Sequence, residues 1–263
     1  ASFVLGFTDW SLYDFNNIKF NGLENFRRLF SEKTFAIAIK NTFYFAIVTV
    51  LIKNIFGFLM ALIVKKTSKF NTLLRAVVFL PMTISVMVVA IIFVSIYNPT
   101  NGIINEGLRA IGLDSLTCDW LFDARYSMNS ICLMDIWQGT GFTMCVMISG
   151  LQAIPTDYYE AAKIDGADKW QQLRYVTLPL LISSITISLV FNIISGFKVF
   201  AQVYSTTNGG PADSTHVLGT FLFKSFGNGF LGYSAAVGLF TTVLIVALSM
   251  TLLAILRKRE VEY

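Results

Sequence analysis

Four long stretches without any Asp, Glu, Lys or Arg constrain this chain more than any other feature. They span 21 to 32 residues each, at positions 76–105, 136–156, 175–197 and 225–256. A helix needs about 20 apolar residues to cross a bilayer, at a rise of ~1.5 Å per residue. Only 14% of the residues are charged, whereas soluble domains carry about 25%. The chain is therefore predicted to be an all-α, polytopic membrane protein, which excludes a soluble enzyme.

Five membrane helices are predicted, and residues typical of turns separate several of them. Asn98-Pro99-Thr100-Asn101-Gly102 and Asn208-Gly209-Gly210-Pro211 mark two connecting loops, because Asn, Gly and Pro favour turns. The apolar stub 1–7 is interpreted as the end of a further, first helix. The predicted helices, in one membrane domain covering 1–263, are 34–64, 73–97, 127–151, 178–204 and 233–256.

Basic residues near the helix ends favour one orientation. The segments 65–75, 153–177 and 257–259 carry ten Lys and Arg residues in total, and they lie on one side if the five helices alternate. The loops 98–126 and 205–232 together hold three basic and five acidic residues. Basic loops tend to stay in the cytoplasm, so the C-terminus is predicted to be cytoplasmic. The basic N-terminal segment departs from this bias.

The sequence contains no motif of a catalytic or metal site. It lacks a phosphate-binding loop, His-Glu-x-x-His, Cys-x-x-Cys and Gly-x-Ser-x-Gly. The single histidine, His216, has no carboxylate or cysteine clustered with it, so we expect a surface residue rather than a metal ligand. Three cysteines give no disulfide framework. We expect no catalytic residue, metal or cofactor in this chain, and the net charge of +4 indicates no nucleic-acid partner.

The segment 153–177, between the third and fourth predicted helices, is interpreted as two short helices. Pro155 ends the membrane helix, and Asp157 followed by Glu160 resembles a capping box. Gly166 permits the left-handed residue that ends the first short helix. The segment is therefore predicted to project from the membrane as a helix, a sharp bend and another helix.

The second short helix is predicted to begin at Asp168, and the next membrane span at Pro179. From the residues alone, an alternative is an amphipathic hairpin that lies on lipid headgroups. Tyr158, Tyr159 and Trp170 favour that alternative, because aromatic side chains are common at membrane surfaces.

The sequence of this segment resembles a motif of a known protein family. Glu160-Ala161-Ala162, then Gly166, Val176 and Leu178-Pro179 at set spacing, resembles the EAA loop of permease subunits of bacterial ABC importers. The resemblance is to the carbohydrate branch, of the maltose-permease F or glycerol-phosphate permease A type. Further matching segments are Gly22-Leu23-Glu24-Asn25-Phe26, Phe79-Leu80-Pro81, Trp137-Gln138-Gly139-Thr140-Gly141-Phe142, Gly150-Leu151-Gln152-Ala153-Ile154-Pro155 and Thr207-Asn208-Gly209-Gly210-Pro211.

The resemblance implies a six-helix transmembrane domain, largely without its first helix here, in a bacterial cytoplasmic membrane. It implies four kinds of partner: a second, non-identical permease, two ATP-binding subunits that hold ATP and Mg, an extracytoplasmic sugar-binding protein, and the sugar. This chain would not itself be an enzyme. The residues implied to couple it to the ATPase are Glu160, Ala161, Ala162, Asp165 and Gly166.

Charged residues inside predicted spans admit two explanations. Lys53, Asp135 and Lys198 lie there, where a charge costs about 2.5 to 3.5 kcal/mol on insertion scales. Asp135 and Lys198 are predicted at similar depth, so an ion pair between them is favoured over a transport role. If they instead relay protons, the chain is an ion-coupled secondary transporter. A membrane scaffold without transport is a further alternative.

A sugar path needs aromatic faces together with amide or hydroxyl groups. Two predicted helices, 127–151 and 178–204, supply such residues, and alignment from Pro155 to Pro179 with the resembling maltose permease places several at its sugar site. Packing between helices is an equal alternative for each of them. The candidates are Trp137, Gln138, Gly139, Phe142, Asn192 and Gly196.

Overall fold

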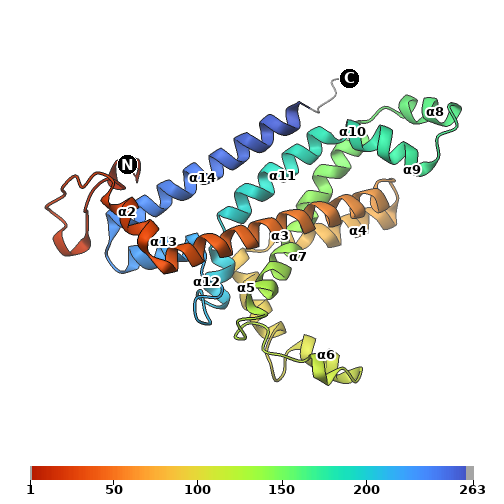
Figure 1. Cartoon of the computed structure of the whole chain (residues 1–263). Helices are drawn as coiled ribbons and strands as arrows, with labels where there is room; N and C mark the ends of the chain where they lie inside the picture. Colours follow the sequence, from red (N-terminus) through yellow and green to blue (C-terminus); the bar gives the residue numbers. More distant parts are fainter. Residues whose placement is uncertain (1, 259–263) are drawn as a thin grey trace. The chain divides into compact units, whose positions relative to one another are not determined.

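The computed structural model describes residues 2–258, and in these residues the regular structure is helical, without a β-strand (Figure 1). The all-α expectation is thus confirmed for this part of the chain. The elements are α1 Ser2–Leu5, η1 Leu12–Asp14, α2 Glu24–Ser31, α3 Lys33–Val64, α4 Lys69–Phe79, η2 Leu80–Thr83, α5 Val86–Ile96, α6 Ile103–Ala110, η3 Asp114–Leu116, α7 Ser127–Ala153, α8 Thr156–Ile164, α9 Lys169–Gln172, η4 Leu173–Thr177, α10 Leu178–Leu180, α11 Ile182–Phe197, α12 Ala201–Thr206, α13 Leu218–Gly227 and α14 Leu231–Arg257.

Three helices are long and apolar enough to cross a membrane by themselves. They are α3 with 32 residues, and α7 and α14 with 27 each, close to the predicted spans 34–64, 127–151 and 233–256. At ~1.5 Å per residue each exceeds the ~30 Å hydrocarbon core. Long apolar stretches with few or no charges thus located these helices to within a few residues.

The other two predicted spans are broken helices, which corrects the expectation of continuous ones. The span 73–97 is divided into α4, η2 and α5, because Pro81 lies in η2 and Ile84 has extended backbone. A proline cannot donate a helical hydrogen bond. The span 178–204 has a bend of 64° between Leu180 and Ile182, and its helix ends at Phe197. Apolar composition alone does not reveal such breaks.

The described residues form two compact units. Residues 2–48, 85–135 and 195–246 make up unit 1, and residues 49–84, 136–194 and 247–258 make up unit 2. Helices α3, α7, α11 and α14 each contribute residues to both units.

Unit 2 is packed closely around an apolar cluster that includes Val64, Met147 and Leu181. Glycines allow this contact: a Cβ at Gly57 would clash with Thr143, and one at Gly150 with Ser184. Small residues at such crossings are the usual way in which membrane helices gain packing energy. Unit 1 has its own cluster, whose members include Leu29, Phe35, Leu218, Phe221 and Val237.

Candidate coupling loop and substrate path

Helix α8 begins directly after a proline. Pro155 is the N-cap residue, with φ −59° and ψ 142°, and no side chain caps the helix. The predicted capping box of Asp157 and Glu160 is therefore wrong, because Thr156 is already the first helical residue. Asp157 lies within the first turn, where its charge is favourable to the helix dipole.

The end of α8 is closed as the sequence predicts. Gly166 has a φ of +80°, and its N–H donates to the Lys163 carbonyl at 3.0 Å. The Ala167 N–H donates to the Ala162 carbonyl at 2.8 Å. This pair of bonds is the Schellman arrangement, which requires a left-handed residue. A Cβ at Gly166 would meet nothing within 4 Å, so within this chain glycine is needed there for backbone conformation and not for space.

A capping box starts α9 at Asp168, the residue that the sequence predicts to begin this helix. The Gln171 N–H donates to Asp168 Oδ1 at 2.7 Å, and the Asp168 N–H donates to Gln171 Oε1 at 2.8 Å. The chain then continues through η4, a π-helical turn at Leu173–Thr177. Pro179 lies in the short α10, so the predicted span starts with a bent segment.

Most of the α8–α9 segment is accessible, and Figure 1 shows it projecting beyond the end of α7. Glu160, Ala161, Asp165 and Gly166 are exposed, and Ala162 is half-buried. Two apolar side chains are also exposed, Ile164 at 87% and Trp170 at 67%. Charged, small and apolar groups presented together are suited to docking on another protein.

One contact ties this projecting helix to the span that follows. The hydroxyls of Tyr159 in α8 and Thr177 in η4 are 3.1 Å apart, and Thr177 Oγ1 also donates to the Gln172 carbonyl at 3.3 Å. A displacement of α8 would therefore be passed to the helix that leads into α10.

The expected path residue Asn192 lies in a buried polar network in unit 2. Its Nδ2 donates to Thr143 Oγ1 at 3.0 Å and to Ser188 Oγ at 3.4 Å. Ser188 Oγ in turn donates to Asn54 Oδ1 at 2.8 Å. Asn54, Thr143 and Ser188 were missed by the sequence analysis, although each is a polar residue within a predicted span. The network joins residues of α3, α7 and α11.

Other expected path residues in unit 2 lie in different surroundings. Phe142 packs against Phe191, with ring centroids 4.2 Å apart. Gln138 is buried, and its Nε2 donates to the Ile84 carbonyl at 2.9 Å. Trp137 is 46% exposed. At Gly139 the absence of a Cβ makes room for the buried Lys53 side chain, and Gly196, in unit 1, is buried.

The predicted ion pair of Asp135 and Lys198 is not formed in this structure. The buried Asp135 accepts a hydrogen bond on Oδ1 from Gln202 Nε2 at 3.1 Å. Lys198 follows the end of α11 at Phe197 and is exposed. It lines a cavity of about 390 Å³ together with Phe200. Within residues 2–258 it makes no ion pair. Because α11 ends before Lys198, the position that continuous helical spacing predicts for this lysine does not apply.

His216 is buried, which corrects the expectation of a surface residue. Its ring is 2% exposed, and Nδ1 lies 2.8 Å from Thr220 Oγ1. Burial lowers the pKa of His216, and Lys224 acts in the same direction whereas Asp213 opposes it. In the described residues no group of three or more His, Cys, Asp or Glu could hold a metal ion.

This burial predicts a loss of stability in acid. Because the pKa of His216 is lower in the fold than its ordinary value of 6.5, the unfolded chain binds a proton first as the pH falls. The stabilisation is complete above pH ~6.5 and decreases below it. Thermal unfolding of the purified protein at pH 8 and at pH 5.5 checks this. His216→Gln is expected to show a smaller pH dependence, and an unchanged one would contradict the assignment.

The chain matches the family model of a known class of membrane proteins. The model of the binding-protein-dependent transport system inner membrane component matches residues 53–261. The chain belongs to this family. The permease is therefore a multi-pass inner-membrane component of a transport system, and the family inferred from the Glu160–Pro179 spacing is confirmed.

Similar proteins cover most of this permease. It is 37% identical over 237 residues to the probable ABC transporter permease protein YurN of Bacillus subtilis strain 168, across 89% of this chain and 80% of that protein. It is 32% identical over 241 residues to the trehalose/maltose transport system permease protein MalF of Thermococcus litoralis, across 92% and 81%.

A solved structure shares the fold. The bacterial alginate ABC transporter, in complex with an alginate pentasaccharide-bound periplasmic protein, contains a chain with a TM-score of 0.81 and 25% identity. The match covers 90% of this permease and 83% of that chain. The expected fold of an ABC importer transmembrane domain is thus confirmed.

Proposed function

We propose that this permease forms half of the translocation pore of an ATP-driven importer of sugars or oligosaccharides. A second, non-identical permease would complete the pore, and an extracytoplasmic binding protein would deliver the sugar. Two separate ATPase subunits would bind ATP and Mg and dock on the α8–α9 segment. One of the similar proteins is named for trehalose and maltose transport, and the similar structure is that of an alginate transporter. These names support sugars as the substrate class.

The observation that carries the coupling role is the construction of α8–α9. A short helix presents Glu160 to its surroundings, ends at a left-handed Gly166, and is fastened by Tyr159 to Thr177. When the ATPase subunits close, α8 would move with them, and the tie would tilt the following span. Such a small shift is converted into a larger rearrangement when helices have two packed arrangements.

The path of the sugar is proposed to follow α7 and α11. Trp137 and Phe142 supply aromatic faces, and Gln138 and Asn192 supply amides. Gly139 and Gly196 would let a ring approach the backbone. Asn192 already donates to Thr143, so it would have to exchange this bond for one to a sugar hydroxyl.

The proposal is tested by reconstituting the permease with its genomic neighbours that encode an ATPase, a second permease and a binding protein. Uptake should require ATP and the binding protein, and it should persist when an uncoupler collapses the proton gradient at constant ATP. An ion-coupled transporter would give the opposite result. A scaffold would not copurify with the ATPase in stoichiometric amount.

The orientation is proposed to place α8–α9 and the C-terminus in the cytoplasm. Lys169→Cys and Ser115→Cys both change exposed residues, in α9 and in the loop before α7. In intact cells, and in a background without Cys118, Cys132 and Cys145, a membrane-impermeant maleimide should label the cysteine at 115 and not the one at 169. Labelling at 169 without permeabilisation would reverse the orientation.

A further inference from the structure

A small aromatic cavity lies in unit 1, between the end of α5, the loop before α7 and the first turns of α7. Its volume is about 220 Å³, and its lining includes Tyr97, Trp120, Tyr126, Asn129 and Leu133. The Tyr97 and Trp120 ring centroids are 6.3 Å apart, and those of Trp120 and Tyr126 are 6.2 Å apart. Trp120 and Tyr126 thus present their rings to one small space, whereas Tyr97 is 2% exposed and packs against Trp120.

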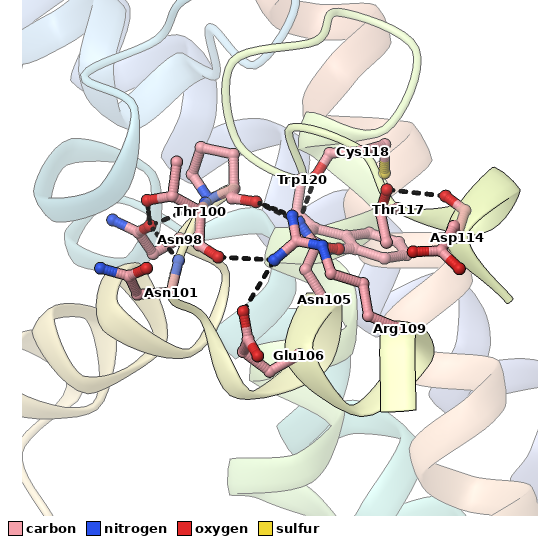
Figure 2. A network of polar contacts seen from close by, with 11 residues as sticks. Asn98, Thr100, Asn101, Asn105, Glu106, Arg109, Asp114, Thr117, Cys118 and Trp120 are labelled. Atoms are coloured by element: carbon pink, nitrogen blue, oxygen red, sulfur yellow. Dashed lines mark hydrogen bonds and ion pairs between the residues drawn. The ribbon is translucent and has the colours of Figure 1, made fainter. Parts of the chain in front are cut away.

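The rings are held in place by a buried polar network, which Figure 2 shows around Trp120. Trp120 Nε1 donates to Asn105 Oδ1 at 2.8 Å. Asn105 is 1% exposed, and its Nδ2 donates to the carbonyls of Pro99 and Cys118 at 3.0 and 2.9 Å. Arg109 fastens the same turn through Nη2 to Pro99. The position of Trp120 is therefore fixed before any ligand arrives.

The remaining side chains leave polar groups available. Tyr97 Oη donates to the Ser130 carbonyl at 2.9 Å, and Asn129 Oδ1 accepts from Tyr44 Oη at 2.6 Å. Asn129 Nδ2 and Tyr126 Oη make no hydrogen bond to the rest of residues 2–258. The lining of the cavity is mainly apolar, and these two groups are the ones that would bind ligand hydroxyls, the amide as a donor and the phenol as donor or acceptor.

We infer that this cavity is an outer subsite for one monosaccharide unit of the transported sugar, occupied on entry to the pore. The apolar face of a pyranose ring packs on aromatic faces, while its hydroxyls need amide and phenol partners. The volume is below the ~300 to 1,000 Å³ of sites for larger ligands, which fits a single sugar ring. The inference rests on the proposed function and adds a subsite outside the path along α7 and α11.

An aromatic belt at the membrane surface would explain Trp and Tyr residues in another way. Belt residues keep their polar tips at the headgroups. Here the polar tips of Trp120 and Tyr97 are turned inward, to Asn105 and Ser130, and Tyr97 is 2% exposed. Tyr97 and Trp120 are therefore not belt residues.

Sugar protection of a cysteine tests the subsite in the assembled transporter, in lipid nanodiscs because maltoside detergents carry a sugar. In a background without Cys118, Cys132 and Cys145, Leu133→Cys places a thiol on the lining, where Leu133 is 55% exposed. Phe122→Cys is the control, because Phe122 lies in the loop that carries Trp120, is 60% exposed and is not among the lining residues. Maltose, trehalose and lactose are the probes, and mannitol is the polyol control.

The expected result is that a sugar which the transporter imports slows maleimide labelling at 133, whereas mannitol does not, and that labelling at 122 is unchanged. Tyr126→Leu should raise the sugar concentration for half-maximal protection and uptake by about twofold to tenfold, as expected for loss of one aromatic contact. Phe122→Leu should raise neither. Import without protection at 133, or equal protection at 122, would overturn the subsite alone. Absence of import for all three sugars would overturn the subsite together with the proposed sugar specificity.

Discussion

Transport is expected to be lost when Glu160→Ala is combined with Gly166→Asp. Glu160 is the exposed carboxylate of α8, and Gly166 closes that helix at a φ of +80°. Removing a hydrogen bond to a charged group costs ~1.5 to 3 kcal/mol, which lowers a coupled rate by about one to two powers of ten. The aspartate adds bulk at the point where a docked partner would approach. Sugar uptake and substrate-stimulated ATPase activity measure the loss.

The membrane spans should stay folded in this double variant, because both residues are exposed and lie outside the spans. The aspartate at a φ of +80° strains the backbone only at the end of α8. Asp157→Asn is a matched control, since it neutralises another exposed carboxylate one turn earlier in α8. It should leave uptake near normal. If the double variant imports sugar at the normal rate and still copurifies with the ATPase, α8 is not the coupling element.

Sugar uptake should also fall by one to two powers of ten in Phe142→Ala and in Asn192→Ala. Phe142→Ala would remove an aromatic stacking face for the sugar. Asn192→Ala would remove a buried hydrogen-bond partner, which costs ~1 to 3 kcal/mol. A hydrogen bond between membrane helices contributes only about 0.6 kcal/mol on average. Thermal stability and basal ATPase activity should therefore change little in Asn192→Ala. Phe142→Ala also loses the packing on Phe191 and is expected to lower the unfolding temperature as well. Initial uptake rates and unfolding temperatures of the same preparations give the two quantities.

The contact between Asn192 and Thr143 provides the control for this second prediction. Thr143→Val removes the hydroxyl that accepts from Asn192 at 3.0 Å and nearly preserves the volume. It is expected to reduce uptake much less than Asn192→Ala. If Thr143→Val and Asn192→Ala lower stability and uptake in proportion, Asn192 joins helices, and the sugar must pass along the partner permease.

The sequence by itself determined the membrane class, the location of the long helices and the family. Charge-free runs longer than 20 residues have few stable conformations in a bilayer other than a helix, so α7 and α14 followed directly, and α3 followed from its long apolar stretch with few charges. Local chemistry also determined the end of α8 at Gly166 and the capping box of Asp168. These features depend on contacts between residues that are close together in the sequence, so they can be predicted without knowledge of the tertiary structure.

Only the tertiary structure decided which polar groups inside the spans meet. Similar depth in the membrane predicted an ion pair of Asp135 and Lys198. Instead α11 ends at Phe197 and Lys198 lines a cavity with Phe200. The Asp135 carboxylate accepts a hydrogen bond from Gln202. His216, without a clustered partner in the sequence, is buried beside Thr220. A buried polar group needs a hydrogen-bond partner, and for Asp135 this partner lies 67 residues further along the chain. Which groups these are depends on how the helices break and pack, and that is settled only when the helices are assembled.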